Sequence, residues 1–115
     1  MKKLFILTVV ALAMGSCATA PTTLYAWHDY ADTTYEYSKR PTDELKSKVL
    51  EEYKLMVENQ NGTRGVVPPG MFAEYGYMLY KLGKTEEGMK YLRQEIDLYP
   101  ESEKYISRII KQLEK

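Results

Sequence analysis

The feature that most constrains this chain is the stretch 69–100, where apolar residues recur at helical spacing on either side of a glycine. The recurring residues are Met71, Phe72, Tyr75, Met78, Leu79 and Leu82 before the glycine, and Met89, Leu92, Ile96 and Tyr99 after it. Such spacing places the residues of each set on one face of a helix. Gly83 can adopt the left-handed conformation that ends a helix, and Pro100 ends the next one. The stretch therefore predicts a helical hairpin, with Pro69 in the first turn and Thr85 as the second N-cap.

This hairpin resembles a tetratricopeptide repeat in three short frames. The frames are Phe72-x2-Tyr75-Gly76-x2-Leu79, Gly88-x3-Leu92 and the closing Pro100. In such a frame, small residues at Gly76 and Gly88 would let the two helices approach closely, while the larger residues fill the space around them. Glu95 departs from the pattern, because the repeat usually has a small residue there. The alternative is an ordinary helical hairpin that contains two glycines.

The rest of the chain after residue 24 also has helical patterns. A first helix is expected from Leu24, where Trp27-x2-Tyr30-Ala31 echoes the first frame at an offset of 45 residues, compared with about 34 in a regular array. Pro41 ends it, and Thr42 caps a second helix. A last helix is expected from about Ser102. The prediction is an all-α fold of about five helices, stacked as two antiparallel hairpins and a terminal helix in a tetratricopeptide-like manner.

The first residues predict a secretion signal. Lys2 and Lys3 precede an apolar core over residues 4–13, which is too short for a membrane span of about 20 residues. Met14-Gly15-Ser16-Cys17 then resembles the lipobox of bacterial lipoproteins, which implies cleavage between Ser16 and Cys17 and acylation of Cys17. The expected organisation is a lipoprotein signal peptide (1–16), a lipidated cysteine and tether (17–23) and a helical domain (24–115).

The lipobox resemblance also favours the outer membrane over the inner membrane. Ala18 follows Cys17, where an aspartate often retains lipoproteins on the inner membrane. The chain is therefore expected on the outer membrane, held by its lipid anchor with the body facing the periplasm.

Charge and composition argue against several functions. Removal of Lys2 and Lys3 would leave 14 basic and 16 acidic residues, without the basic stripe that nucleic acid binding requires. With one histidine, His28, and one cysteine, the sequence offers no cluster of metal ligands. No nucleophile motif, phosphate loop or dinucleotide fingerprint occurs in it. We therefore expect no enzymatic activity, metal or cofactor.

The compositional oddity is eleven tyrosines, all after residue 24. Tyrosine combines a large apolar face with a polar group and is enriched at protein interfaces. The aromatic residues that so small a body is not expected to bury together are Trp27, Tyr30, Tyr37 and Tyr77. They are the candidate partner-binding residues. The alternative is that tyrosine simply fills the core of a small protein.

Two segments resemble a family of small bacterial lipoproteins known as a domain of unknown function (number 4810). They are LYAWHDYADTTYEYSK (24–39) and VPPGMFAEYGYMLYKLGKTEEGMKYLRQEIDLYPES (67–102). The resemblance implies an accessory subunit of an outer-membrane assembly, with a lipoprotein similar to the curli secretion channel as a candidate partner. It carries over no catalytic residues. The sequence thus predicts a scaffold or adaptor lipoprotein. The alternative is a peptide- or peptidoglycan-binding module that uses exposed tyrosines.

Overall fold

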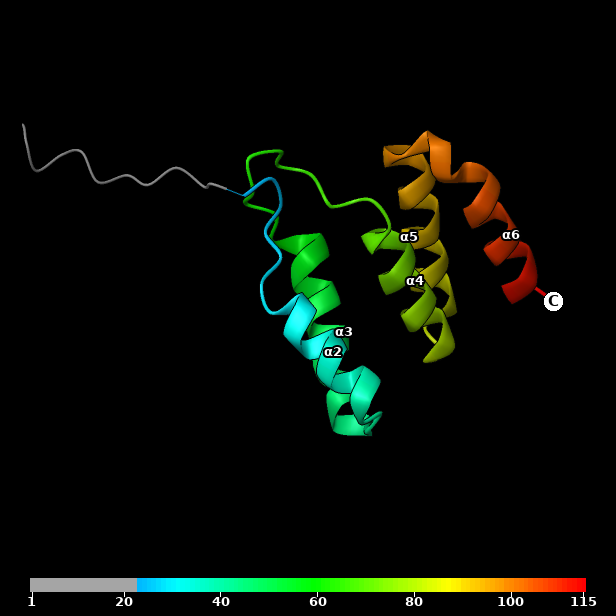
Figure 1. The fold of residues 1–115 in the computed structure, drawn as a ribbon. Helices are drawn as coiled ribbons and strands as arrows, with labels where there is room; N and C mark the ends of the chain where they lie inside the picture. The colour runs from blue at the N-terminus through cyan, green and yellow to red at the C-terminus, as the bar shows by residue number, and fades with distance from the viewer. Residues whose placement is uncertain (1–22) are drawn as a thin grey trace, which may run out of the picture.

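The computed structural model describes residues 23–115, which form helices and loops without a strand. The helices are α2 (Tyr30–Lys39), α3 (Asp43–Glu58), α4 (Met71–Lys81), α5 (Thr85–Leu98), a 3₁₀ turn η1 (Pro100–Ser102) and α6 (Glu103–Leu113) (Figure 1). The prediction of an all-α fold with five α-helices is confirmed. The expected signal peptide, Ser16 and Cys17 lie outside the described residues.

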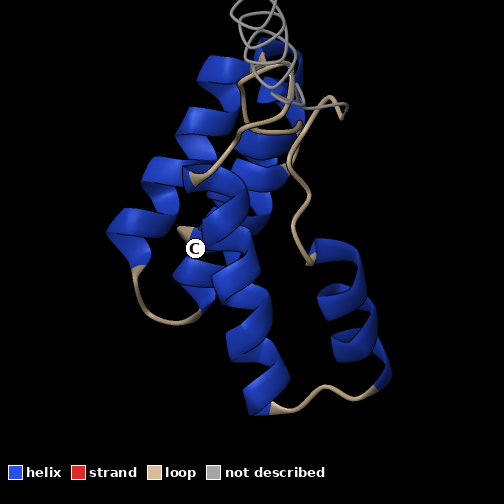
Figure 2. Cartoon of the chain, turned by 90° about the vertical axis from the view of Figure 1, so that its left-hand side faces the viewer, coloured by secondary structure: helices blue, strands red, loops and turns tan. Residues whose placement is uncertain are grey.

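The helices follow one another across the molecule in chain order. α2 packs on α3, α3 on α4, α4 on α5 and α5 on α6, so that each helix lies beside its neighbour in the sequence (Figure 1). The view in Figure 2 shows the same helices joined by loops, of which residues 59–70 form the connection from α3 to α4. No helix in the described part is long and apolar enough to cross a membrane.

The segment that precedes α2 is fastened to the loop after α3. The backbone N–H of Arg64 donates to the carbonyl of Leu24 at 3.1 Å. The side-chain Nε2 of Gln60 donates to the carbonyl of Ala26 at 2.8 Å. The Oε1 of the same side chain accepts from the backbone N–H of Ala26 at 3.0 Å. These bonds satisfy backbone groups that a helix would otherwise pair internally.

The helix expected from Leu24 therefore begins later, at Tyr30. His28 has a φ of +45° and turns the chain just before the helix starts. Trp27 precedes α2, so its expected place on a helical face with Tyr30 is wrong. The two rings nevertheless lie 5.7 Å apart, because the turn brings them together.

The helix ends lie close to the positions predicted from the sequence, with differences of one or two residues at α4 and α5. The Thr42 hydroxyl accepts from the N–H of Leu45 at 3.2 Å, as expected of an N-cap. Thr85 is the first residue of α5 and Lys84 is its N-cap, so the predicted Thr85 cap is wrong. α4 begins at Met71, two residues after Pro69, which lies outside the helix.

The most extensive helix contact joins α4 to α5. A Cβ added at Gly76 would lie 2.6 Å from the Gly88 carbonyl oxygen, and one added at Gly88 would lie 2.5 Å from the Gly76 carbonyl oxygen. The backbones thus touch where side chains are absent. Leu79 and Leu92 are buried beside this crossing.

A second buried cluster joins α3 to α4 and to the loop between them. It contains Met56, Val67 and Met71, with Tyr30, Tyr53, Val57 and Phe72 packed against it. Since Tyr30 comes from α2, this cluster connects the first hairpin to the second.

Candidate functional site: a groove between α4 and α6

A groove of about 870 Å³ lies between α4 and α6. Both helices pack against α5 or the turn that follows it, and the end of α5 lines the groove between them. Its walls are formed by Ala73, Tyr77 and Lys81 of α4 and by Tyr105, Ile106, Ile109 and Leu113 of α6. Glu95 and Tyr99 come from the end of α5.

Hydrogen bonds hold the two ends of the groove. At one end, the Tyr80 hydroxyl of α4 donates to the carbonyl of Leu113 at 2.8 Å, which ties the end of α6 to α4. At the other, the Tyr99 hydroxyl donates to the carbonyl of Val67 at 2.6 Å, and the Ser102 hydroxyl donates to the carbonyl of Tyr99 at 2.7 Å. The groove is therefore bounded by bonded elements at both ends.

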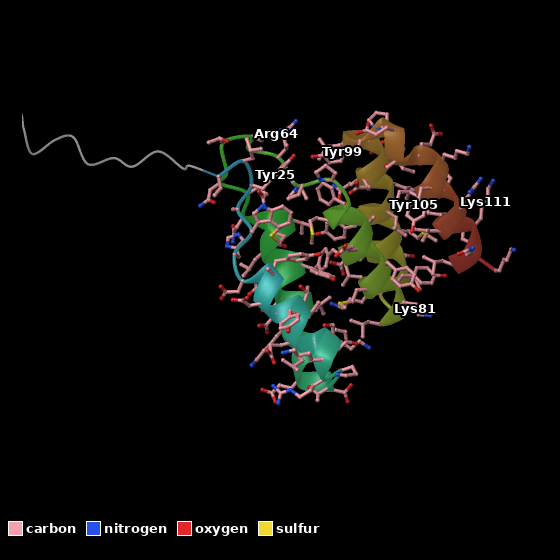
Figure 3. The ribbon with its side chains drawn as sticks, in the orientation of Figure 1. Tyr25, Arg64, Lys81, Tyr99, Tyr105 and Lys111 are labelled. Carbon is pink, nitrogen blue, oxygen red and sulfur yellow. The ribbon has the colours of Figure 1, made fainter. Side chains whose placement is uncertain are left out.

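Two exposed tyrosines line the groove from opposite sides. Tyr77 of α4 is 46% exposed and Tyr105 of α6 is 68% exposed. Figure 3 shows Tyr99, Tyr105 and Lys81 in order from the top of the molecule to the bottom. Large aromatic side chains beside an apolar wall are typical of protein interfaces.

Three carboxylates line the end of the groove near the start of α4: Glu74, Glu95 and Glu101. Glu95 is only 2% exposed. Its Oε1 accepts from the Gly70 N–H at 2.7 Å, whereas its Oε2 is buried without a hydrogen-bond partner. Lys81 lines the groove from the last turn of α4. The groove thus has an acidic end and a lysine toward the other.

Burial raises the pKa of several tyrosines. Desolvation raises the pKa of Tyr75 to about 12, and the nearby Tyr91 and the carboxylates of Glu87 and Glu58 act in the same direction. Burial also raises the pKa of Tyr53, followed by the charge of Glu74. Both hydroxyls therefore stay protonated to a higher pH than a tyrosine with the ordinary pKa.

The structure separates the four candidate partner-binding residues. Tyr77 lines the groove. Trp27 is 45% exposed but lies in the segment before α2, with its ring 6.0 Å from that of Tyr25. Tyr30 is partly buried, packs on the α3–α4 cluster and donates a hydrogen bond to Glu74 at 3.2 Å. Tyr37 is also partly buried. The four residues do not form one surface.

The hairpin residues lie where the second pair of helices meets. Tyr75, Gly76, Leu79, Gly88 and Leu92 are buried. Phe72 is partly buried and stacks on Tyr91 with a ring separation of 5.9 Å. Gly83 has a φ of +88° in the turn, and Pro100 begins η1.

Sequence reasoning missed the role of Glu95. The signal was available, because Glu95 follows Leu92 by three residues and precedes Tyr99 by four, which places it on the inner face of α5. A carboxyl group at such a position is costly to bury without hydrogen-bond partners. Tyr105 was missed because its place in the groove depends on how α6 turns back after Pro100.

Metal ligands do not gather in the described residues: no group of three or more histidine, cysteine or acidic side chains could hold an ion there. What residues 23–115 present is an open groove with an apolar wall, exposed tyrosines and an acidic end.

These features define a small all-α domain with an open groove. The chain belongs to the family described as domain of unknown function (DUF4810), whose profile matches residues 24–109. Comparison with curated proteins and with solved structures found no match.

Proposed function

We propose that this protein is a lipid-anchored adaptor of the bacterial cell envelope, which binds another envelope protein along the α4–α6 groove. The observation that supports this most is the pair of exposed tyrosines, Tyr77 and Tyr105, on opposite sides of an apolar wall. Tyrosines in such positions supply large contact areas at interfaces. The function is binding and not catalysis.

The proposed anchor is Cys17. Acyl chains there would hold the protein on the membrane, because stable anchoring takes more than one chain. Residues 18–23 could span about 20 Å if extended. They lead to the segment that is bonded to the loop after α3 through Leu24 and Arg64. Tyr25 and Arg64 lie at the same end of the molecule as Tyr99 (Figure 3). The tether would therefore join the body near the acidic end of the groove.

The proposed arrangement is a short helical repeat. Each helix packs on the next, and the backbones of α4 and α5 touch at Gly76 and Gly88, as a tetratricopeptide-like hairpin would require. In this interpretation α2 with α3 forms the first unit, α4 with α5 the second, and α6 the terminal helix. A stack of so few units has an incomplete core, which a partner could complete.

The proposed location is the periplasmic face of the outer membrane. A lipoprotein similar to the curli secretion channel is the partner that the resemblance implies. The second candidate function is binding of peptidoglycan, which the same exposed tyrosines would favour, because rings of this kind can stack on sugars and peptides.

Purification from native membranes in mild detergent tests the proposal. We expect a stoichiometric envelope protein to co-purify with the full-length, lipidated chain. A photo-crosslinking amino acid at Tyr77 should capture this protein. The same amino acid at Tyr35, which is 57% exposed on α2, is the control and should not capture it. Retention on peptidoglycan without any protein partner would favour the second candidate and contradict the first.

A further inference from the structure

We infer that the acidic end of the groove binds a basic side chain, lysine or arginine, carried by the polypeptide segment that docks between α4 and α6. This inference rests on the proposed function, because it takes the groove to be the place where a partner protein lies. It adds a recognition element that is chemically specific.

The central residue is Glu95. Its carboxyl group lines the groove although the residue is only 2% exposed, so this group lies at the buried base of the groove. One oxygen accepts the Gly70 N–H at 2.7 Å. The other oxygen is buried and has no partner. A buried acceptor without a donor is costly, and the cost is greater for a charged group.

The neighbouring charges have the same sign. Glu74 lies in the first turn of α4 and Glu101 in η1, and both line the groove with Glu95. In residues 23–115 the structure pairs none of these three carboxylates with a lysine or an arginine. The salt bridges it forms are Arg40–Glu36 and Lys48–Glu44, both within exposed helix surfaces. Glu74 accepts a hydrogen bond from the Tyr30 hydroxyl at 3.2 Å, but this donor carries no charge. The acidic end of the groove therefore forms no salt bridge within the described residues.

A basic side chain of a partner fits this environment. An ammonium or guanidinium group would supply the missing donor and form charge-assisted hydrogen bonds with the carboxylates. The methylene stem of the same side chain could lie along the apolar wall of Ala73, Ile106 and Ile109. A small inorganic cation would use the carboxylates but would leave the apolar wall and the two tyrosines uncovered. The groove therefore favours a polypeptide segment.

Lys81 gives the segment a direction. It lines the groove from the last turn of α4, whereas Glu95 and Glu101 lie near the start of that helix. A segment with a basic residue at one end and an acidic or polar residue at the other would match both ends. Electrostatic complementarity of this kind sets orientation and specificity more than affinity.

A titration with small probes tests the recognition element directly. The full-length lipidated chain in detergent micelles is titrated with N-acetyl-lysine amide, and the amide signal of Gly70 is followed by NMR. N-acetyl-norleucine amide, which lacks the ammonium group, is the matched probe. We expect a saturable shift at Gly70 with the lysine probe and none with the norleucine probe. An equal response to the two probes would overturn the inference.

Two variants test whether Glu95 is responsible for the response to the lysine probe. Glu95→Gln retains an oxygen that can accept the Gly70 N–H and removes the charge, so it should fold while its affinity for the lysine probe falls roughly tenfold or more. Glu87→Gln removes a charge from an exposed site on α5 outside the groove and should bind the probe as the wild type does. Unchanged affinity of a folded Glu95→Gln variant would overturn the inference.

Co-purification separates this inference from the proposed function. If the Glu95→Gln protein recovers the envelope partner at wild-type levels, the adaptor role stands and the recognition element is wrong. If the lysine probe binds at Glu95 but no protein co-purifies, the adaptor role fails and the carboxylate site itself stands. Retention on peptidoglycan that Glu95→Gln abolishes would assign the basic group to a cell-wall amine and overturn the polypeptide occupant.

Discussion

At the scale of single residues, neighbouring tyrosines of α4 have opposite environments. Tyr75 is buried against Tyr91, with ring centroids 4.8 Å apart, and burial raises its pKa to about 12. Tyr77, two residues later, is 46% exposed and lines the groove. Because residues two apart on a helix point in different directions, one tyrosine stabilises the hairpin and the other is available for binding.

The raised pKa of Tyr75 predicts a loss of stability in alkali. Up to about pH 10, the ordinary pKa of tyrosine, both folded and unfolded chains keep this proton. Between pH 10 and about 12 the unfolded chain loses the proton and the folded chain retains it, so the free energy of unfolding falls as pH rises. Tyr75→Phe should make this decrease smaller, as measured by urea unfolding at successive pH values.

Exposed Tyr105 is the matched control for that measurement. Tyr105→Phe should leave the decrease in stability as steep as in the wild type, because this residue is 68% exposed. An equally steep decrease in Tyr75→Phe and in the wild type would show that Tyr75 does not contribute to the alkaline loss of stability.

At the scale of elements, the crossing of α4 and α5 depends on two glycines. An added Cβ at either position meets backbone atoms of the other helix, which cannot move aside as a flexible side chain can. Alanine forms helices better than glycine by about 1 kcal/mol, so propensity alone would favour the substitution. The contact geometry favours glycine instead.

Gly76→Ala and Gly88→Ala should each lower the free energy of unfolding by about 1–3 kcal/mol, the cost of overpacking. The double variant should cost less than the sum of the two, because both added Cβ groups separate the same pair of helices. Urea unfolding followed by circular dichroism measures all three. Stabilisation of either single variant would contradict the close approach.

The sequence allowed prediction of much of this hairpin. Leu79 and Leu92, chosen from their spacing, are both buried, and Gly83 has the left-handed conformation expected of a helix end. It did not allow prediction of the start of α2. Helical periodicity extends from Leu24, but Gln60 and Arg64, more than 30 residues away, bond the backbone there and prevent a helix. Such contacts are not visible in a local pattern.

At the scale of the whole molecule, the groove results from how three helices lie together. Tyr77 and Tyr105 are 28 positions apart, and only the turn at η1 brings α6 back along α4. For this reason the sequence indicated an excess of aromatic residues without showing where they gather. Tyr30 was expected at the same surface, but its ring packs on the α3–α4 cluster.

The proposed membrane anchor predicts a simple biochemical result. Cys17→Ser should abolish labelling by a radioactive fatty acid, because the acylated thiol is lost. Ser16→Ala keeps a small residue before the cysteine and should be labelled normally. Persistent labelling of the Cys17→Ser protein would contradict the lipoprotein interpretation.

Tyr77→Ala tests most directly whether the α4–α6 groove binds an envelope protein. Because Tyr77 lies outside the buried face, the melting temperature should remain nearly unchanged. Recovery of the partner from native membranes should fall, since truncation of an aromatic anchor costs more than about 2 kcal/mol of binding energy. Tyr35→Ala, at an even more exposed tyrosine of α2, should recover the partner normally. A folded Tyr77→Ala protein that recovers the partner at wild-type levels would contradict the account.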